Sequence, residues 1–491
     1  MKNNPEKKGA DKMEYELVMG LEVHVELSTE TKLFCACSTA FGAEPNENVC
    51  PACCGMPGMP PVLNKRAVEL GVTAALLTGC EISRTLTFDK KNYFYPDLPT
   101  GYQNTQFFNP VGRGGSLEVE TASGKKTIRI KQIHIEEDAG KLVHERGKTL
   151  VDCNRAGVPL IEIVSEADFS SAEEVTAYLE RLRALLSFAN VSDCRMQEGS
   201  MRCDVNLSVR PYGETVLGTR TEIKNMNSLK AIARAIEYEY GRHTDALADK
   251  TEVLVQETRR WDDARGVTYA MREKEDATDY RYFSNPEVLP VALDDAWFEQ
   301  IRASVPETSE QKKIRFLAIG LPEYDAAILA RTKSLADIFD AAHAHISEPK
   351  EISNRIIMDL IGMSKEAAVA LDEIKIDGKK MARLIGLTAS GKINRAAEKL
   401  ALYAAMTEDA DPDEFIAARG LAMVGGGEQL ERLADEVLAE NEKSVSEIIG
   451  GNQKAMGFLI GKLMKKTEGK ADPKAAAKII EEKISRIKAR Q

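Results

Sequence analysis

The stretch from Tyr15 to Leu27, YELVMGLEVHVEL, constrains the fold more than any other part of the sequence. Apolar and polar residues alternate along it, and a strand places successive side chains on opposite faces. One face of the predicted strand is therefore apolar, and the other carries Glu22, His24 and Glu26. Carboxylates that share a face raise each other's pKa unless a cation lies between them, and an imidazole offers a nitrogen ligand or a proton carrier. The polar face is either a divalent-metal site or the solvent-facing side of an edge strand.

The chain is longer than one hydrophobic core normally supports. Its 491 residues predict two to four domains, and 43% hydrophobic with 29% charged residues is typical of a soluble globular protein. No apolar run is long enough to span a membrane, and the N-terminal MKNNPEKKGADKMEYE lacks the apolar segment of a secretory signal. We therefore expect a cytoplasmic protein without a membrane partner.

The formal net charge of −11 is distributed unevenly. Residues 452–491 contain eleven Lys or Arg and four Asp or Glu, so this segment carries +7 and the preceding 451 residues carry −18. A basic end on an acidic body suggests a polyanion that is bound at that end only. A solvated, lysine-rich helical face would give the same count, so the segment alone decides nothing.

Five of the nine cysteines lie between Cys35 and Cys54. Without an export signal, such clustering favours metal binding over disulfides. The pairs Cys35–Cys37 and Cys50–Cys53 are separated by twelve residues, which suits a tetrahedral site of four thiolates. Four protein ligands leave no open position, so the metal would be structural zinc. The C-x-x-C spacing favours Cys53 over Cys54 as the fourth ligand, and buried cysteines without a metal are the alternative.

A second acidic cluster ends the segment TIRIKQIHIEED, residues 127–138. Its apolar alternation changes phase between Lys131 and Gln132, which predicts a β-bulge. His134, Glu136 and Glu137 follow the bulge and are re-aimed by it. Bulges of this kind are frequent next to active sites.

Glu162 lies inside the apolar run from Val158 to Val164. A carboxylate in that setting must be paired, protonated or bound to a metal, because burying it alone costs several kcal/mol. Lys, Arg or Mg²⁺ could each satisfy it.

Two later segments also alternate, and they place charged side chains on one face of each strand. These are Arg202, Asp204, Asn206 and Ser208 in the first and Arg220, Glu222 and Lys224 in the second. Cross-strand salt bridges explain any single pair. Their recurrence favours an antiparallel sheet with a polar face that binds ATP and a divalent ion, since carboxylates hold hard cations and guanidinium groups neutralise phosphate. The sequence has neither the P-loop nor the Rossmann glycine pattern.

Helical periodicity appears at three places. It predicts helices from about Lys65 and over residues 171–189, and after about Val305 it replaces strand alternation altogether.

Taken in order, these motifs resemble the successive signatures of the B subunit of the aspartyl/glutamyl-tRNA(Asn/Gln) amidotransferase family. The matching segments are GLEVHVEL, TKLFCAC, VCPACCGMPG, FDKKNYFYPDLPTGYQ, HIEEDAGKLVHE, DCNRAGVPLIEIVSEAD, EGSMRCDVNLSVR, TEIKNMNS, DYRYF and NQKAMGFLIGKLMK. They cover nearly the whole chain.

The resemblance implies an α+β fold in three parts: a catalytic domain similar to glutamine synthetase at 13–304 with a zinc knuckle at 35–53, a helical domain at 305–411, and a helical, tRNA-binding tail at 412–491. It also implies an ATP-dependent ligase that works in a heterotrimer with an amidase, the A subunit, and with a small C subunit. Such an enzyme converts misacylated Glu-tRNA(Gln), and often Asp-tRNA(Asn), to the amides with ammonia that the amidase releases from glutamine.

Motif by motif, the resemblance also suggests roles for individual residues. The expected catalytic residues and Mg²⁺ ligands are Glu22, His24, Glu136 and Glu137, with Glu162 as a further catalytic candidate. Candidate phosphate or substrate contacts are Lys91, Arg155, Arg202 and Lys224. Histidine is an unusual ligand for Mg²⁺, so His24 acts through water or the site admits Mn²⁺. The cysteines match the zinc-containing members of the family, and other members lack them, which supports a structural role.

Two other functions stay open. A zinc-knuckle protein that binds nucleic acid without chemistry would leave the acidic strand faces unexplained. A stand-alone ATP-dependent amide ligase acting on a small acid would leave the helical tail unexplained.

Overall fold

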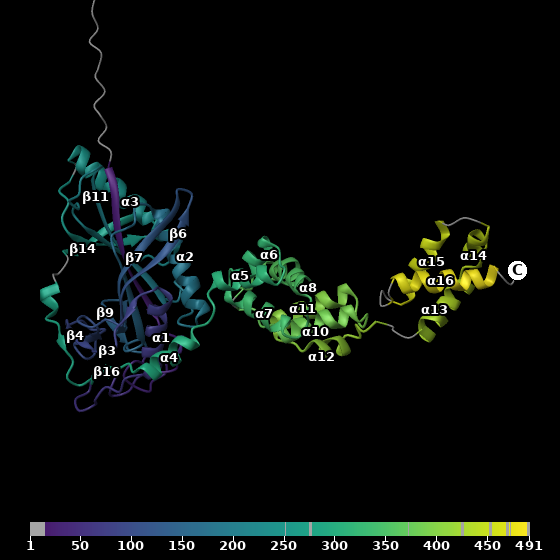
Figure 1. The fold of residues 1–491 in the computed structure, drawn as a ribbon, viewed down its shortest axis with the longest axis horizontal. Helices are drawn as coiled ribbons and strands as arrows, with labels where there is room; N and C mark the ends of the chain where they lie inside the picture. Colours follow the sequence, from purple (N-terminus) through teal and green to yellow (C-terminus); the bar gives the residue numbers. More distant parts are fainter. Residues whose placement is uncertain are drawn as a thin grey trace, which may run out of the picture. The chain divides into compact units, whose positions relative to one another are not determined.

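The computed structural model describes residues 15–250, 252–273, 277–371, 373–423, 427–450, 454–467, 471 and 473–488. The chain forms two compact units that divide after Thr308 (Figure 1). The boundary predicted after residue 304 lies close to this division. The predicted catalytic domain begins at residue 13, and residues 13 and 14 lie outside the described ranges.

The first unit is built on a nine-stranded sheet with β1 in its centre (Figure 1). Its strands, in spatial order, are β14 (Val267–Glu273), β13 (Glu257–Asp262), β12 (Thr221–Lys224), β11 (Met201–Pro211), β1 (Tyr15–Glu26), β10 (Pro159–Ser165), β7 (Gly124–Glu137), β6 (Gly112–Thr121) and β2 (Glu81–Ile82). The prediction of an antiparallel sheet is confirmed for the other pairs of this sheet, but β12 and β13 are parallel. Helix α3 (Leu229–Asp249) joins them, as a parallel pair needs a crossover.

Three helices cover the apolar face of the sheet: α1 (Lys65–Leu77), α2 (Ala172–Phe188) and α3. The strands contribute Val23, Ile161 and Leu207, none of which is exposed. Helix α1 begins at the predicted residue. The side chain of Ser171 accepts a hydrogen bond from the Glu174 N–H and so fixes the start of α2.

The predicted bulge is present in β7. Val164 pairs with Gln132 and Ser165 with Ile130, so Lys131 has no partner on β10. The change of phase keeps the isoleucines on both sides of it in the core, and it turns His134 and Glu136 toward the polar face of β1.

Short strands form three smaller sheets, and β5 (Tyr102–Thr105) of one of them contacts β7. One three-stranded sheet contains β15 (Phe283–Ser284), β4 (Asp89–Asn92) and β5, and two pairs are β3 (Thr85–Leu86) with β16 (Val291–Ala292) and β8 (Lys141–Glu145) with β9 (Lys148–Asp152). The pairing of β6 with β7 ends at Ile133. Beyond it, the side-chain amide of Gln106 accepts from the Ile135 N–H at 3.0 Å and that of Gln103 donates to the Glu137 carbonyl at 2.6 Å. These two side chains hold the end of β7 in place. The 3₁₀ helix η1 (Ala277–Tyr280) and helix α4 (Asp295–Ser304) complete the unit.

The described residues of the second unit form helices only, which confirms the predicted change at about Val305. They are α5 (Ser309–Ala318), α6 (Glu323–Leu329), α7 (Lys333–His343), α8 (Pro349–Asn354), the π-helix η2 (Arg355–Leu360), α9 (Ile361–Glu366), α10 (Gly378–Ala389), α11 (Arg395–Glu408), α12 (Pro412–Ala418), α13 (Gly427–Glu440), α14 (Glu442–Ile449), α15 (Lys454–Lys466) and α16 (Pro473–Lys488). Within the described parts of the chain, no helix is both long and apolar enough to cross a membrane.

Helices α13 to α16 share a core of their own, which includes Leu459, Leu463 and Ile480. Helix α12 packs against α10 and α11, and Arg383 pairs with Asp413 at 2.7 Å. The predicted start of the tail at residue 412 therefore falls on a helix that contacts the preceding ones.

Gly115 in β6 allows the sheet edge to approach the end of α1. A Cβ at this position would lie 2.5 Å from the Thr78 carbonyl oxygen and 2.6 Å from Cys80 Sγ. We expect Gly115→Ala to lower the free energy of unfolding by about 1–3 kcal/mol, as overpacking does. Gly241 is the matched control, because it is exposed in α3 and a Cβ there meets no atom within 4 Å. Gly241→Ala should leave the thermal midpoint unchanged or raise it. Equal midpoints for the two variants would contradict the described packing at β6.

Candidate functional site

The polar face of the sheet carries a row of side chains from neighbouring strands. His24 lies opposite Glu162 of β10 on one side and Arg202 of β11 on the other. Glu162 in turn lies opposite His134 of β7. Residues opposite one another in an antiparallel sheet project from the same face, so these four share a surface that the helices do not cover.

His24, Glu136 and Glu162 form the first cluster on this face. The Nε2 atom of His24 lies 3.5 Å from Glu136 Oε1 and 3.6 Å from Glu162 Oε2. One ligand atom from each residue can be chosen so that all lie within 4.8 Å of one another. His134 Nε2 approaches the same carboxylates, at 3.0 Å from Glu162 and 3.4 Å from Glu136. The predicted association of His24 with Glu136 is therefore present, and Glu162 joins them.

Cations offset the two carboxylates of this cluster, of which Glu136 is buried and Glu162 is partly buried. Burial raises the pKa of Glu162, but the charges of His134 and His24 lower it further, to well below its usual range. Burial lowers the pKa of His134. The carboxylates of Glu162 and Glu136 have the larger, opposite effect and raise this pKa to about 10. The two carboxylates thus attract positive charge from the side chains around them.

Lys91 of β4 is directed at the same carboxylates. Burial lowers its pKa, yet the charges of Glu136, Tyr282 and Glu162 raise it above its ordinary value. Its Nζ atom lies 5.0 Å from the centre of the Tyr280 ring, within the range of a cation–π contact. Lys91 is therefore a cation held beside the first cluster.

Glu22, Asp204 and Glu222 form a second cluster, from β1, β11 and β12. Lys224 forms ion pairs with Asp204 and, at 3.3 Å, with Glu222. Burial lowers the pKa of Lys224, but Asp204 and Glu222 raise it above the ordinary value. The Thr258 hydroxyl donates to Glu222 at 2.8 Å. The prediction that Glu22 joins His24 and Glu136 in one metal site is wrong, because the ligand set containing Glu22 comes from strands on the other side of β1.

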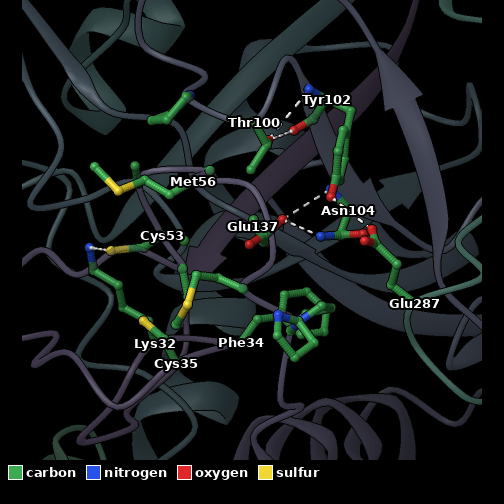
Figure 2. A pocket seen from close by; sticks show the side chains of 18 of the residues that line it. Lys32, Phe34, Cys35, Cys53, Met56, Thr100, Tyr102, Asn104, Glu137 and Glu287 are labelled. Atoms are coloured by element: carbon green, nitrogen blue, oxygen red, sulfur yellow. Dashed lines mark hydrogen bonds between the residues drawn. The ribbon is translucent and has the colours of Figure 1, made fainter.

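Glu137 is also not part of the first cluster, contrary to prediction, because successive residues of a strand project to opposite sides. Its Oε2 atom accepts from the backbone N–H of Asn104 at 3.1 Å and from the side-chain amide at 2.7 Å (Figure 2). Burial raises the pKa of Glu137 to about 7, against the lowering effect of Asn104. Glu137 lines a cavity of about 400 Å³ together with Lys32 and Cys53.

Arg155 and Arg202 meet at Asp138, which is 4% exposed. Arg202 Nη2 lies 3.0 Å and Arg155 Nε 3.2 Å from its Oδ2 atom. Burial raises the pKa of Asp138, but the two guanidinium groups hold it below its ordinary value. Both predicted phosphate contacts are thus engaged with a buried carboxylate, and their predicted role stays a prediction.

Glu26 shares this corner of the site, and burial together with the charge of Asp138 raises its pKa from 4.5 to about 8. Between these pH values the folded state keeps a proton that the unfolded state releases, so Glu26 contributes stability below pH 4.5 that is lost as the pH rises through 8. We expect the thermal midpoint of the wild type to fall relative to that of Glu26→Gln across this range. Glu30→Gln, at an exposed position, is the control and should show a constant difference. A constant difference for Glu26→Gln as well would contradict the raised pKa.

The four predicted cysteine ligands come together: Cys35, Cys37, Cys50 and Cys53. Cys53 Sγ lies 4.0 Å from Cys37 Sγ and 3.9 Å from Cys50 Sγ. A tetrahedron with Zn–S bonds of about 2.3 Å separates its sulfurs by about 3.8 Å. The spacing therefore fits zinc, and Cys54 is not part of the group, as the C-x-x-C pattern predicted.

Comparison with known proteins identifies the family. Residues 17–299 match the GatB/GatE catalytic domain model and residues 337–484 the GatB domain model. The chain is 49% identical over 475 residues to the B subunit of the aspartyl/glutamyl-tRNA(Asn/Gln) amidotransferase from Lachnoclostridium phytofermentans, which covers 96% of this chain and 99% of the relative. It is 46% identical over 476 residues to the protein of that name from Thermoanaerobacter pseudethanolicus, covering 96% of this chain and 100% of the relative. The chain belongs to this amidotransferase B-subunit family.

For a member of the B-subunit family, the two carboxylate clusters differ in the ion that they fit. The second cluster offers carboxylate oxygens, the donors that Mg²⁺ prefers. The first cluster adds a histidine nitrogen, which suits Mn²⁺ as well. In both clusters, a side-chain cation lies beside the carboxylates, as Lys91 does in the first and Lys224 in the second.

Several residues of this B-subunit site were not predicted as site residues from the sequence. The sequence predicted that Asp204 and Glu222 lie on polar strand faces. That they lie close to Glu22 follows only from the order of the strands in the sheet. His134 was seen beside the bulge, and Asp138 follows two glutamates in the sequence. The available signal for Asp138 was a run of three consecutive acidic residues at the end of β7.

Proposed function

We propose that this chain activates the side-chain carboxylate of Glu-tRNA(Gln), Asp-tRNA(Asn) or both with ATP and converts it to the amide with ammonia. Family membership over nearly the whole chain is the observation that carries this proposal. Two acidic clusters on one face of the sheet support it, with Lys91 of β4 beside the first of them. Neither alternative function accounts for both the clusters and the helical unit.

The chemistry explains the composition of the site. A carboxylate resists ammonia because its oxygen is a poor leaving group. Transfer of the γ-phosphoryl group of ATP to that oxygen releases ADP and gives an acyl phosphate. Ammonia then forms the C–N bond, the C–O bond breaks, and phosphate leaves with the electron pair and takes up the proton that the nitrogen loses. Such reactions depend chiefly on positioning and on neutralisation of phosphate charge.

The residues divide this work between them. His24, Glu136 and Glu162 would hold one divalent ion, and Glu22, Asp204 and Glu222 another. Mg²⁺ or Mn²⁺ would supply neutralisation of the phosphate oxygens. Lys91 offers a further positive charge to an incoming phosphate, and the aromatic rings of Tyr93, Tyr280 and Tyr282 surround it. The predicted contacts of Arg155 and Arg202 with substrate would require them to share their charge with Asp138.

The other parts of the chain support the reaction. The cysteine cluster would hold structural zinc, since four thiolates leave no position for a substrate. The partners would be an amidase, which is the A subunit of the complex and supplies ammonia from glutamine, and a small C subunit. The Lys-rich helices at the C-terminal end would bind the tRNA, and the sheet domain would share the architecture of glutamine synthetase. Such an enzyme would work in the cytoplasm.

Lys91 and Lys90 make a matched pair for testing the site. They are neighbours in β4, but Lys90 pairs with Glu287 at 2.7 Å and lines the Glu137 cavity. We expect Lys91→Met to lower kcat for amidation by about 10²-fold, the usual scale for one electrostatic interaction with a transition state. Lys90→Met should stay within a few-fold of wild type. Equal losses would contradict the assignment of Lys91 to phosphate.

The experiment that tests the proposed function is a transamidation assay of the chain with its copurifying partner proteins. ATP-dependent formation of Gln-tRNA(Gln) or Asn-tRNA(Asn), with glutamine as donor, is the expected result. Amidation of a small free acid without tRNA would support the stand-alone ligase. Binding of tRNA without ATP turnover would support the nucleic-acid-binding alternative.

A further inference from the structure

Lys32 is a completely buried lysine beside the cysteine cluster, with a relative exposure of 0%. Its ammonium group donates to Cys53 Sγ at 3.6 Å (Figure 2). It also donates to the Cys153 carbonyl at 3.1 Å. The charge of Lys32 also acts on the Glu137 carboxylate, whose pKa it lowers, and both residues line the same cavity. A buried ammonium group without an anionic partner costs several kcal/mol, and the sulfur of Cys53 is the group of this cluster within hydrogen-bond distance of it.

The charge of the cysteine cluster explains this arrangement. Four thiolates around one Zn²⁺ carry a net charge of −2, and a donor from the surroundings stabilises such a cluster. Four protonated thiols would carry no charge and would leave the Lys32 ammonium without a charged group in hydrogen-bond contact. The burial of Lys32 against Cys53 therefore favours an anionic cluster.

Lys32 also connects the cluster to the segment that precedes β10. The Cys153 carbonyl accepts from Lys32, and the Cys153 N–H donates to Asn46 in the loop between the cysteine pairs at 2.7 Å. Two residues further on, Arg155 contacts Asp138 beside the polar face. The cluster and this segment are thus held together from both sides.

We propose that Lys32 is the cationic positioning residue of the metal centre, which stabilises the Cys53 thiolate and fixes the cluster to the Cys153 segment. This inference rests on the proposed zinc occupancy of the four cysteines. It adds a residue that no spacing of cysteines could reveal, since Lys32 precedes the first of them.

Zinc release tests the proposal in the full-length chain. Lys32→Met removes both charge and donor, Lys32→Gln keeps a donor, and Lys65→Met changes an exposed lysine as a control. We expect transfer of zinc to a chromogenic chelator to be about 10–100-fold faster in both Lys32 variants, as for other residues that contact metal ligands. Lys65→Met should match the wild type. Zinc release at the wild-type rate from both Lys32 variants would overturn the proposal.

Stability in a zinc-free background separates charge from packing. Cys37→Ser removes one proposed ligand, and in this background Lys32 has no thiolate cluster to neutralise. Lys32→Met should then raise the thermal midpoint or leave it unchanged, whereas in the zinc-loaded chain it should lower it. A lowered midpoint in both backgrounds would mean that Lys32 stabilises the fold through contacts other than the thiolate cluster, such as the one with the Cys153 carbonyl, and would overturn the proposal. If the Lys32→Met chain loses zinc too quickly for its release rate to be measured, this comparison of thermal midpoints still tests the proposal.

The same experiments distinguish failure of the proposed role of Lys32 from failure of the proposed zinc occupancy of the four cysteines. A wild-type chain that takes up no zinc, and no Co²⁺ with thiolate charge-transfer absorption, would refute the metal centre itself. A zinc-loaded wild type with unaffected Lys32 variants would refute only the role of Lys32.

Discussion

Glu136→Gln should abolish ATP-dependent amidation while tRNA binding stays close to that of the wild type. Glu136 is 2% exposed and lies within 3.5 Å of both His24 and His134, so a neutral amide there removes half of the carboxylate charge of the first cluster. Loss of one such electrostatic interaction costs on the order of 10²–10³-fold in kcat, and more when a metal ligand is removed. The measurement is the rate of amide formation on misacylated tRNA, with ADP release followed in parallel.

The control for this variant is Glu120→Gln, an exposed glutamate in β6 of the same sheet. It should retain wild-type turnover and the wild-type thermal midpoint. Survival of turnover in Glu136→Gln would show that the divalent ion is not held by the first cluster.

Removal of residues 427–491 should reduce tRNA affinity by at least about 100-fold and leave ATP binding intact. Helices α13 to α16 have a separate core, so the truncation removes a whole packing unit and keeps α12 with its contacts to α10 and α11. Residues 452–491 of this segment contain eleven Lys or Arg and four Asp or Glu. Removing lysines that neutralise phosphates lowers both the affinity and its salt dependence. Filter binding at two salt concentrations measures both quantities.

Charge reversals in the full-length chain check that the truncation acts through phosphate contacts. Lys462 and Lys465 are exposed on α15, whereas Lys483 is engaged with Asp435 at 2.7 Å. Lys462→Glu and Lys465→Glu should weaken tRNA binding and flatten its salt dependence. Unchanged affinity in the truncated chain, with unaltered turnover on a small acid, would favour the stand-alone ligase.

Local features of the fold were predictable because each depends on neighbours in the sequence. Alternation placed Glu22, His24 and Glu26 on one face of β1, and a change of phase located the bulge at Lys131. The spacing of the cysteines was enough to choose Cys53 over Cys54.

The composition of each cluster was not predictable from the sequence, because it depends on which strands become neighbours. Glu22 lies only two residues from His24, yet its carboxylate belongs with Asp204 and Glu222. Glu137 follows Glu136 directly, but it projects to the other side and accepts from Asn104. Periodicity shows which residues share a face, and strand order decides which of them meet.

The central claim is that one face of the sheet holds divalent ions and the triphosphate together. Crystals grown with Mn²⁺ and a non-hydrolysable ATP analogue, measured at the manganese absorption edge, test it most directly. The account predicts anomalous peaks among His24, Glu136 and Glu162 and among Glu22, Asp204 and Glu222, with phosphate density within reach of Lys91. Nucleotide bound with manganese elsewhere on the chain, and none on this face, would contradict it.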